Sequence, residues 1–241
     1  MSTSPTTTRQ RILRAASELL DQGGREAVST RAVSAAAGVQ APTLYRLFGD
    51  KNGLLDAVVG AAFGEYLAGK RALVSTGDPV EDLRRGWDLH VAFGLDRPQV
   101  YVLMYDLLYG GDPAGTAATA AREAAAQLHR IVARIADAGR LRMSVRRAAQ
   151  LVHGTSSGLV LSLIATPPAE RDIEILTVAR ESVLATITTP GEGGVGEPGD
   201  DVSARAVALR AALQRRPAGV LTDAEHGLLA EWLDRLGDAR S

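Results

Sequence analysis

The residues most suggestive of catalysis run from Gly154 to Gly158 and fit the G-x-S-x-G pattern of a serine nucleophile. Such a serine needs a preceding strand and a surrounding hydrolase sheet, and the fold must bring a histidine base and an acid to it. His153 adjoins the run, but adjacency in sequence does not supply triad geometry. Because the run lies in a segment of helical periodicity without neighbouring strands, a helical hydrolase is a remote alternative.

A second pattern, from Gly191 to Gly196, fits the G-x-G-x-x-G run of dinucleotide-binding proteins. In those proteins a helix start follows the glycines and accepts the pyrophosphate. Here the sequence continues Glu-Pro-Gly-Asp-Asp, which offers no helix start and would repel a phosphate. The stretch is more typical of a linker, and we place a linker at 190–202.

Metal chemistry has little support in the composition. The chain has 241 residues and no cysteine, which excludes disulfides and thiolate metal sites. The four histidines are far apart and lack metal-ligand spacing. They are His90, His129, His153 and His226. We therefore expect no metal, no cofactor, no catalytic residue and no enzyme activity.

The elements that carry these residues are all predicted to be helices, because no segment alternates apolar and polar residues with the period of two that a strand shows. Expected helices cover 8–22, 30–38, 41–48 and 51–73, and others start near 79, 98, 114 and 144. Gly23 and Gly24 are expected to stop the first helix, and Pro167 and Pro168 the one from 144. A ninth helix is expected over 169–188, and two more beyond the linker.

The segment from Ser29 to Lys51 reads STRAVSAAAGVQAPTLYRLFGDK and predicts a helix-turn-helix. Ser29 is a good N-cap, and Gly38 suits the left-handed conformation of a tight turn between helices. The residues expected to face inward are Ala32, Val33, Ala36 and Val39, with Leu44 and Phe48 from the next helix. Small and polar residues then gather at the start of the second helix, the end that such proteins present to base edges.

Local charge supports contact with DNA. The whole chain has a net charge of −1, which excludes a bulk attraction to nucleic acid. Up to Lys51, however, seven basic residues stand against four acidic ones, so this segment is net positive. Positive charge concentrated at one end of a neutral protein is what phosphate binding requires.

The stretch RILRAASELL…VSTRAVSAAAGVQAPTLYRLFGDKNGLLDAV resembles the N-terminal domain of TetR-family repressors, over about the first quarter of the chain. The resemblance implies that eight residues lie at the DNA surface. They are Thr30, Arg31, Gln40, Ala41, Pro42, Thr43, Tyr45 and Lys51. Ser34 and Leu47 depart from the usual alanine and histidine of the family, and a buried Tyr45 in a plain helical bundle is the structural alternative.

The later helices resemble the TetR-family C-terminal domain only in pattern. The resemblance implies a homodimer through the eighth and ninth helices, and a small-molecule pocket between the fourth and eighth. Candidate dimer residues are Val152, Gly154, Gly158 and Leu159. Candidate pocket residues are Phe63, Tyr66, Trp87, His90, Phe93, Tyr101, Met104, Tyr105, Tyr109 and His153.

We therefore expect an all-α protein with a helix-turn-helix DNA-binding domain at 1–52 and a ligand-binding and dimerisation domain at 53–189. Residues 1–7 are expected to be a disordered arm, and 203–241 a helical extension of unknown role. The predicted function is a ligand-responsive repressor that binds a palindromic operator on double-stranded DNA. A helical protein-interaction module without specific DNA binding is the alternative. With no signal peptide or membrane span apparent, the protein is expected to be cytoplasmic.

Overall fold

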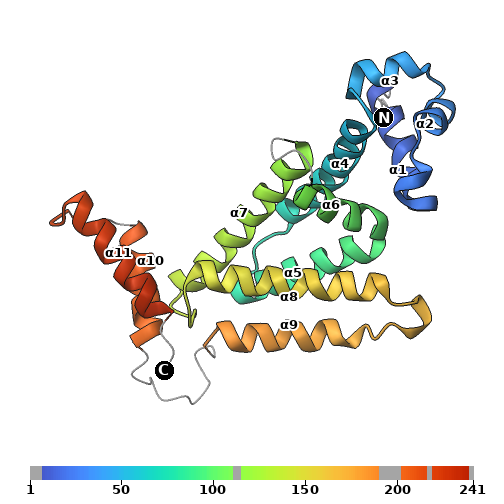
Figure 1. The fold of residues 1–241 in the computed structure, drawn as a ribbon. Helices are drawn as coiled ribbons and strands as arrows, with labels where there is room; N and C mark the ends of the chain where they lie inside the picture. Colours follow the sequence, from blue (N-terminus) through green and yellow to red (C-terminus); the bar gives the residue numbers. More distant parts are fainter. Residues whose placement is uncertain (1–6, 111–114, 190–201, 216–218, 239–241) are drawn as a thin grey trace. The chain divides into compact units, whose positions relative to one another are not determined.

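The computed structural model describes residues 7–110, 115–189, 202–215 and 219–238, and the regular elements there are helices (Figure 1). The α-helices are α1 (Thr8–Ala27), α2 (Thr30–Ala37), α3 (Ala41–Phe48), α4 (Lys51–Ala72), α5 (Pro79–Asp96), α6 (Pro98–Gly110), α7 (Thr116–Asp137), α8 (Val145–Ala165), α9 (Glu174–Ile187), α10 (Val202–Arg215) and α11 (Asp223–Gly237). The only β pairing in the described ranges is an isolated bridge between Leu141 and Thr188. The prediction of an all-α fold is confirmed.

The first helix extends beyond its predicted end. Thr7 caps α1 and forms a capping box with Gln10, while residues 1–6 of the predicted arm lie outside the described ranges. Gly23 and Gly24 leave helical geometry as expected, but the chain resumes a short helical turn that reaches Ala27. The two glycines therefore kink the helix rather than end it, because the residues after them still favour helix.

Local chemistry also fixes the helix-turn-helix. Ser29 caps α2 by accepting a hydrogen bond from the Ala32 amide, and Gly38 ends it at φ 63° and ψ 43°. The predicted inward face of α2 was wrong by one residue, since Ala37 is buried whereas Ala36 is exposed. A helix of two turns is too short for its periodicity to fix the buried face, and packing on α1 decides it.

The chain packs as two compact units. Unit 1 comprises residues 1–73 and 92–124, and unit 2 comprises 74–91 and 125–241. Helices α5 and α7 each contribute residues to both. This grouping by contacts differs from the expected division at residue 53, which concerns function and stays a prediction.

In unit 1, α4 is the central element. It contacts α1, α3 and α6, and it also holds the start of α7. The Asp56 carboxylate of α4 accepts hydrogen bonds from the Thr116 and Ala117 amides at 2.8 and 3.0 Å. A Cβ on Gly60 would lie 2.6 Å from Thr116 Oγ1, so glycine permits this close approach. Any shift of α4 therefore acts on α1, α6 and the first turn of α7.

In unit 2, α8 and α9 lie side by side in antiparallel orientation, and α10 pairs with α11 as a hairpin (Figure 1). Asp238, just after α11, joins this hairpin to the start of α8. Its Oδ1 accepts from the Ser144 amide at 3.1 Å, and its backbone oxygen accepts from Arg147 Nη1 at 2.7 Å. Ser203 adds bonds to the Arg142 and Gly237 carbonyls. The predicted C-terminal extension is thus a packed helical hairpin, while residues 190–201 of the predicted linker lie outside the described ranges.

Among the described helices, α8 alone is long and apolar enough to cross a membrane by length and composition. It carries polar residues such as Gln150 and Ser157, and part of its surface is buried inside unit 2, with Val160 and Leu163 in the core. These features are typical of a core helix in a folded body.

Candidate nucleic-acid interface

The predicted DNA-contacting residues lie on two adjacent helices and at the start of a third. Thr30 and Arg31 open α2, five of the residues lie on α3 or cap it, and Lys51 opens α4. All eight are exposed or half-buried, so none is part of the core. The chain thus places these residues together on the surface of one small head. That they touch DNA stays a prediction.

The start of α3 is open to an external partner. Gln40 occupies the N-cap position, yet its side chain makes no cap hydrogen bond. Pro42 in the first turn has no amide hydrogen and supplies a fixed φ, which suits a helix start. The Thr43 amide already donates to the Gln40 carbonyl at 3.0 Å, whereas the exposed Gln40 side chain is available to phosphate and base groups.

The exposure of Tyr45 tests the alternative that this residue belongs to the core. It is 53% exposed, whereas Leu44 beside it is buried. Arg46 and Leu47 are exposed next to it, so an aromatic ring, a cation and an apolar group share the outer face of α3. A core role for Tyr45, the structural alternative, is wrong.

The junction between α3 and α4 fixes Lys51 relative to α3. Gly49 adopts φ 77°, and Asp50 caps α4 by accepting from the Gly53 amide at 2.8 Å. A Cβ at Gly53 would lie only 2.1 Å from the Phe48 carbonyl oxygen, so that position requires glycine. Gly53 is a positioning residue that the sequence did not reveal. A glycine inside a predicted helix does not indicate which atoms will lie close to it.

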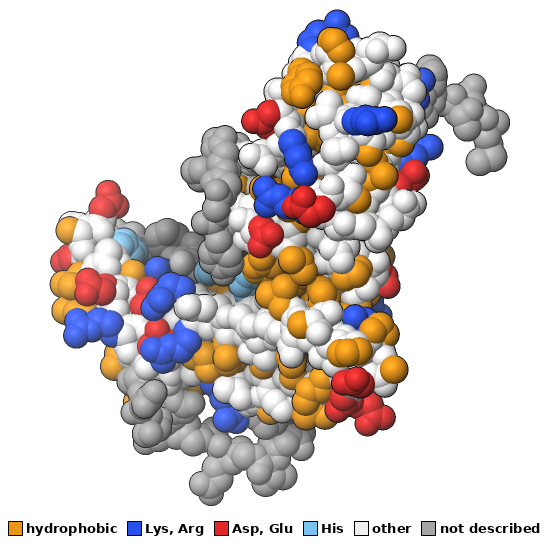
Figure 2. Space-filling model, turned by 45° about the vertical axis from the view of Figure 1, so that its right-hand side comes forward, with side chains coloured by type: hydrophobic (Ala, Val, Ile, Leu, Met, Phe, Trp, Pro, Cys, Tyr) orange, Lys and Arg blue, Asp and Glu red, His pale blue; other side chains and the backbone are white. Residues whose placement is uncertain are grey.

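The charges of the head are distributed over its surface. The Arg9 guanidinium lies over the Phe48 ring at 5.3 Å from its centroid, and Arg25 donates to the Asn52 side chain at 3.2 Å. Figure 2 shows blue Lys and Arg side chains over the region of α1–α4 at the top of the view. Such a surface offers phosphate contacts around the exposed face of α3.

Half of the predicted pocket residues form one aromatic cluster in unit 1. Phe63 and Tyr66 of α4 contact Phe93 of α5 at centroid distances of 5.7 and 4.8 Å. Tyr101 and Tyr105 of α6 continue the chain of rings at 6.2 and 5.3 Å. Met104, buried on α6, belongs to the same unit. The side chain of Tyr109 lies outside the described residues.

The remaining pocket candidates lie in unit 2. Trp87 is buried on α5, His90 is half-buried one turn later, and His153 is exposed on α8. Trp87 Nε1 and the unpredicted Gln127 Nε2 are buried donors without a hydrogen-bond partner in the described part of the chain. Buried donors are rarely left unpaired, and Nε of Arg140 and of Arg210 are in the same position in unit 2.

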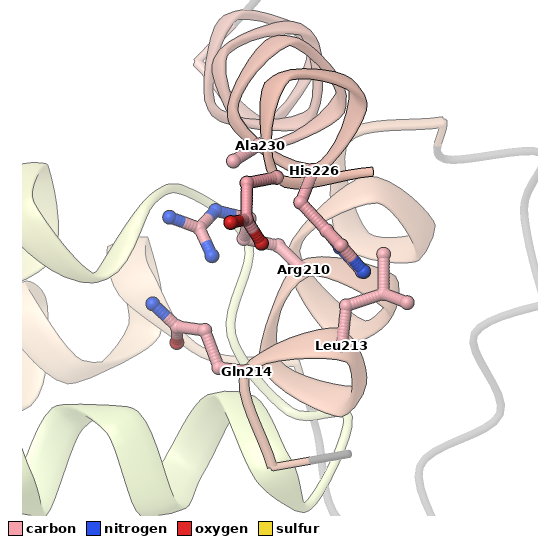
Figure 3. Close-up of a pocket in the computed structure, with 6 residues that line it drawn as sticks. Arg210, Leu213, Gln214, His226 and Ala230 are labelled. Carbon is pink, nitrogen blue, oxygen red and sulfur yellow. The ribbon is translucent and has the colours of Figure 1, made fainter. Parts of the chain in front are cut away.

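A cavity of about 310 Å³ lies elsewhere, between α10 and α11 (Figure 3). It is lined by Arg210, Leu213, Gln214, Asp223, His226 and Ala230. Arg210 pairs with Asp234 at 3.4 Å, and the lining mixes both charge signs. No predicted pocket residue lines this cavity.

The predicted dimer residues lie on α8. Gly154 and Gly158 are exposed, Leu159 is half-buried, and Val152 is buried inside unit 2. The serine motif lies inside the same helix, where Ser156 donates to the His153 carbonyl and Ser157 contacts His153 Nδ1 at 3.3 Å. A helix rather than a strand thus precedes the serine, and the second glycine pattern lies outside the described residues.

Known proteins were compared with the head and with the whole chain. Residues 12–58 match the family model described as bacterial regulatory proteins, tetR family. No curated protein matches the chain. Among solved structures, a transcriptional regulator from Rhodococcus sp. is similar over 77% of this chain and all of its own, at 19% identity and a TM-score of 0.65.

Two further solved structures are similar over their length. PfmR, a TetR-family regulator from Thermus thermophilus, matches 72% of this chain and 97% of its own, at 23% identity and a TM-score of 0.58. A TetR variant from Acinetobacter baumannii, solved in complex with minocycline, matches 73% and 93%, at 22% identity and a TM-score of 0.55. The head that matches the family model is thus joined to the helical fold of these regulators. By this match, residues 12–58 are a DNA-binding domain of the TetR family of bacterial regulatory proteins, a family whose members are not enzymes.

Proposed function

We propose that the protein is a cytoplasmic, ligand-responsive repressor that binds a two-fold operator as a homodimer and leaves it when a small molecule binds. The observation that carries this proposal is the exposed outer face of α3, with Tyr45 exposed beside a junction that fixes Lys51. In this proposal Tyr45 and Lys51 bind phosphates, while Arg31, Gln40, Pro42 and Thr43 read bases. Ala41 is too small for hydrogen-bonded readout, so DNA shape contributes much of the selectivity.

A homodimer is supported by the outward face of α8 and α9. On α9, Val178 is 59% exposed and Ile175 lies one turn before it on the same side. On α8, Leu151 is exposed, and no atom lies within 4 Å of a Cβ built on Gly154 or Gly158. Figure 2 shows orange apolar side chains over the lower part of the molecule, where these helices lie. A second copy packed here would bury this face and set two heads on a two-fold DNA site.

Two connections would transmit ligand binding to the head. Helix α4 carries Lys51 at one end and Phe63 and Tyr66 of the aromatic cluster in its second half. Arg97, between Phe93 and Tyr101 in sequence, donates to Ser17 Oγ of α1 at 2.6 Å and pairs with Asp21 at 3.3 Å. A ligand that displaced the aromatic rings would move both α4 and α1. DNA and ligand would then oppose each other by linkage.

The DNA-binding part of the proposal is tested by selecting genomic fragments with the purified full chain and measuring affinity for the selected duplex. We expect specific binding that weakens steeply as salt is raised, because phosphate contacts release counterions. Tyr45→Ala and Lys51→Ala should abolish it while far-UV circular dichroism stays helical. Trp232→Ala and Arg235→Ala on α11 are matched controls, since Trp232 and Arg235 are exposed outside the head. Retained affinity in both head variants would refute the assignment.

The dimer is tested by Gly158→Leu, with Gly227→Leu on α11 as its control. Both glycines are exposed and have no atom near the built Cβ within one chain. Both variants should therefore fold. Only Gly158→Leu should shift the mass measured by light scattering toward a monomer, because a leucine there would block close approach of a partner helix. An unchanged mass for Gly158→Leu, or a monomeric wild type, would contradict the proposed interface.

A further inference from the structure

The aromatic cluster of unit 1 gathers half of the ten aromatic side chains in the protein. It joins Phe63 and Tyr66 of α4, Phe93 of α5, and Tyr101 and Tyr105 of α6 through successive ring contacts of 4.8 to 6.2 Å. Three helices thus place their π faces together in a protein that is otherwise poor in aromatics. The rings of Phe63, Tyr66 and Tyr101 are buried, so a flat apolar molecule that entered between these helices would meet their π faces.

A lysine ends the apolar stripe that α4 turns toward this cluster. The buried positions Val59, Phe63 and Tyr66 follow one another at helical spacing, and Lys70 comes one turn later on the same side. Its Nζ lies 5.0 Å from the centre of the Tyr66 ring. Burial lowers the pKa of Lys70 to about 8, so the amine is still mostly protonated at neutral pH.

This ammonium group has no counter-ion among the residues that the structure describes. No carboxylate there pairs with Lys70, and its neighbour Arg71 pairs with Glu123 at 2.8 Å instead. Burial, with a smaller effect of Tyr105, raises the pKa of Tyr66, so that phenol stays neutral. Lys70 is half-buried by its accessible surface, and such a cation against aromatic rings, with no anion beside it in the described ranges, is stabilised when a bound group supplies the missing charge.

We propose that Lys70 and the Tyr66–Phe93–Tyr101 rings form the effector site, and that the effector is an aromatic organic acid. Its carboxylate pairs with the Lys70 ammonium, and its ring system packs against the cluster. The inference rests on the proposed effector response and names the ligand class for it. A neutral aromatic molecule would bury the same cation further without neutralising it, so the site discriminates by charge.

The test uses the full chain and two probes of equal shape, 2-naphthoate and 2-naphthamide, with binding measured by isothermal titration calorimetry. The acid should bind about 10- to 100-fold more tightly than the amide, which is the range of one charge-assisted hydrogen bond. Lys70→Met should remove this preference by weakening the acid alone, and Lys70→Arg should largely keep it. Arg71→Met is the matched control, because it removes a neighbouring exposed cation of the same helix.

The Lys70→Met variant should fold, since methionine removes a half-buried charge, and a melting temperature no lower than that of the wild type checks this. Equal affinity of acid and amide for the wild type, or an acid preference unchanged in Lys70→Met, would overturn the proposal. Failure of the acid to bind at millimolar concentration would also overturn it.

Release of the selected operator separates this inference from the proposed function. If naphthamide releases DNA and naphthoate does not, the effector response stands and the ligand class is wrong. If no specific duplex is ever selected, the regulator proposal fails, while the binding of the two probes is still measured independently.

Discussion

The segment that joins α4 to α5 is held by one carboxylate, and replacing it should destabilise the fold in a pH-dependent way. Asp82 on α5 accepts from Ser75 Oγ at 2.7 Å, from the Thr76 amide at 2.8 Å and from Thr76 Oγ1 at 2.9 Å. It also pairs with Arg134 of α7 at 2.8 Å, and its side chain is only 9% exposed. Burial alone would raise the pKa of Asp82, but the bonds from Thr76, Ser75 and Arg134 outweigh it and hold the pKa well below its usual range.

Asp82→Asn keeps one acceptor oxygen and loses the charge, so it removes the ion pair and leaves Ser75 or Arg134 short of an acceptor. The loss of one charge-assisted bond with a partly exposed partner is about 2 kcal/mol. For a chain of this size that corresponds to a fall in melting temperature of about 4–8 °C. Asp88→Asn is the control, because the Asp88 side chain is 59% exposed in its pair with Arg180, and a carboxylate that solvent reaches in this way contributes at most about 1 kcal/mol.

The sign of the pH dependence follows from the depressed pKa. The stabilisation by Asp82 is fully present above the pKa of an unfolded aspartate, about 3.9, and is lost as pH falls through the lower folded value. The gap in melting temperature between wild type and Asp82→Asn should therefore be constant from pH 7 to pH 5 and begin to close below about pH 4. Thermal unfolding followed by circular dichroism measures it. Equal melting of Asp82→Asn and Asp88→Asn at pH 7, or a gap as large at about pH 2 as at pH 7, would refute this account of the linkage.

Four further substitutions test the packing. Gly38→Ala should cost about 1 kcal/mol, because the residue has φ 63° and open space around it, so that backbone strain alone is measured; no fall in melting temperature would contradict this. In α11, Gly237→Ala should lower the melting temperature, because its Cβ would lie 2.9 Å from Val207 Cγ2, whereas Gly227→Ala should leave it unchanged or raise it; the reverse order would show that the hairpin packs differently. Gln127→Met should raise the free energy of unfolding by about 1 kcal/mol, since it replaces a buried amide nitrogen that lacks a hydrogen-bond partner with an apolar group of similar size. Chemical denaturation measures this free energy, and a lower value for the variant would contradict the prediction.

Local chemistry made the head predictable from its residues. Ser29, Gly38 and Pro42 act within a few residues of their own positions, so their roles as cap, turn and helix start follow from the sequence alone. Packing over longer distances did not follow in the same way. The buried face of α2 moved from Ala36 to Ala37, and the need for glycine at position 53 depends on the Phe48 carbonyl.

The candidate pocket shows the same limit. Aromatic residues between Trp87 and Tyr109 are visible as a cluster in the sequence, yet Trp87 and Tyr101 fall in different packed units. Lys70 escaped notice because a lysine normally ends an apolar stripe by reaching solvent. Only the ring beneath its ammonium group and the lack of an acid beside it in the described ranges distinguish it from a surface residue.

The two lysines of α4 lie on one helix that joins the predicted DNA surface to the proposed effector site. Lys51 opens the helix at the predicted DNA surface, and Lys70 lies near its other end beside the aromatic cluster. At about 1.5 Å per residue they are about 29 Å apart along the axis. If the Lys70 end stays in place, a tilt of roughly 10° would move Lys51 by about 5 Å, more than the roughly 3.4 Å between neighbouring base pairs along DNA. In a dimer whose two heads must fit successive turns of one groove, a displacement of that size in each head breaks the register, so binding at Lys70 would not need to unfold any part of the head to release DNA.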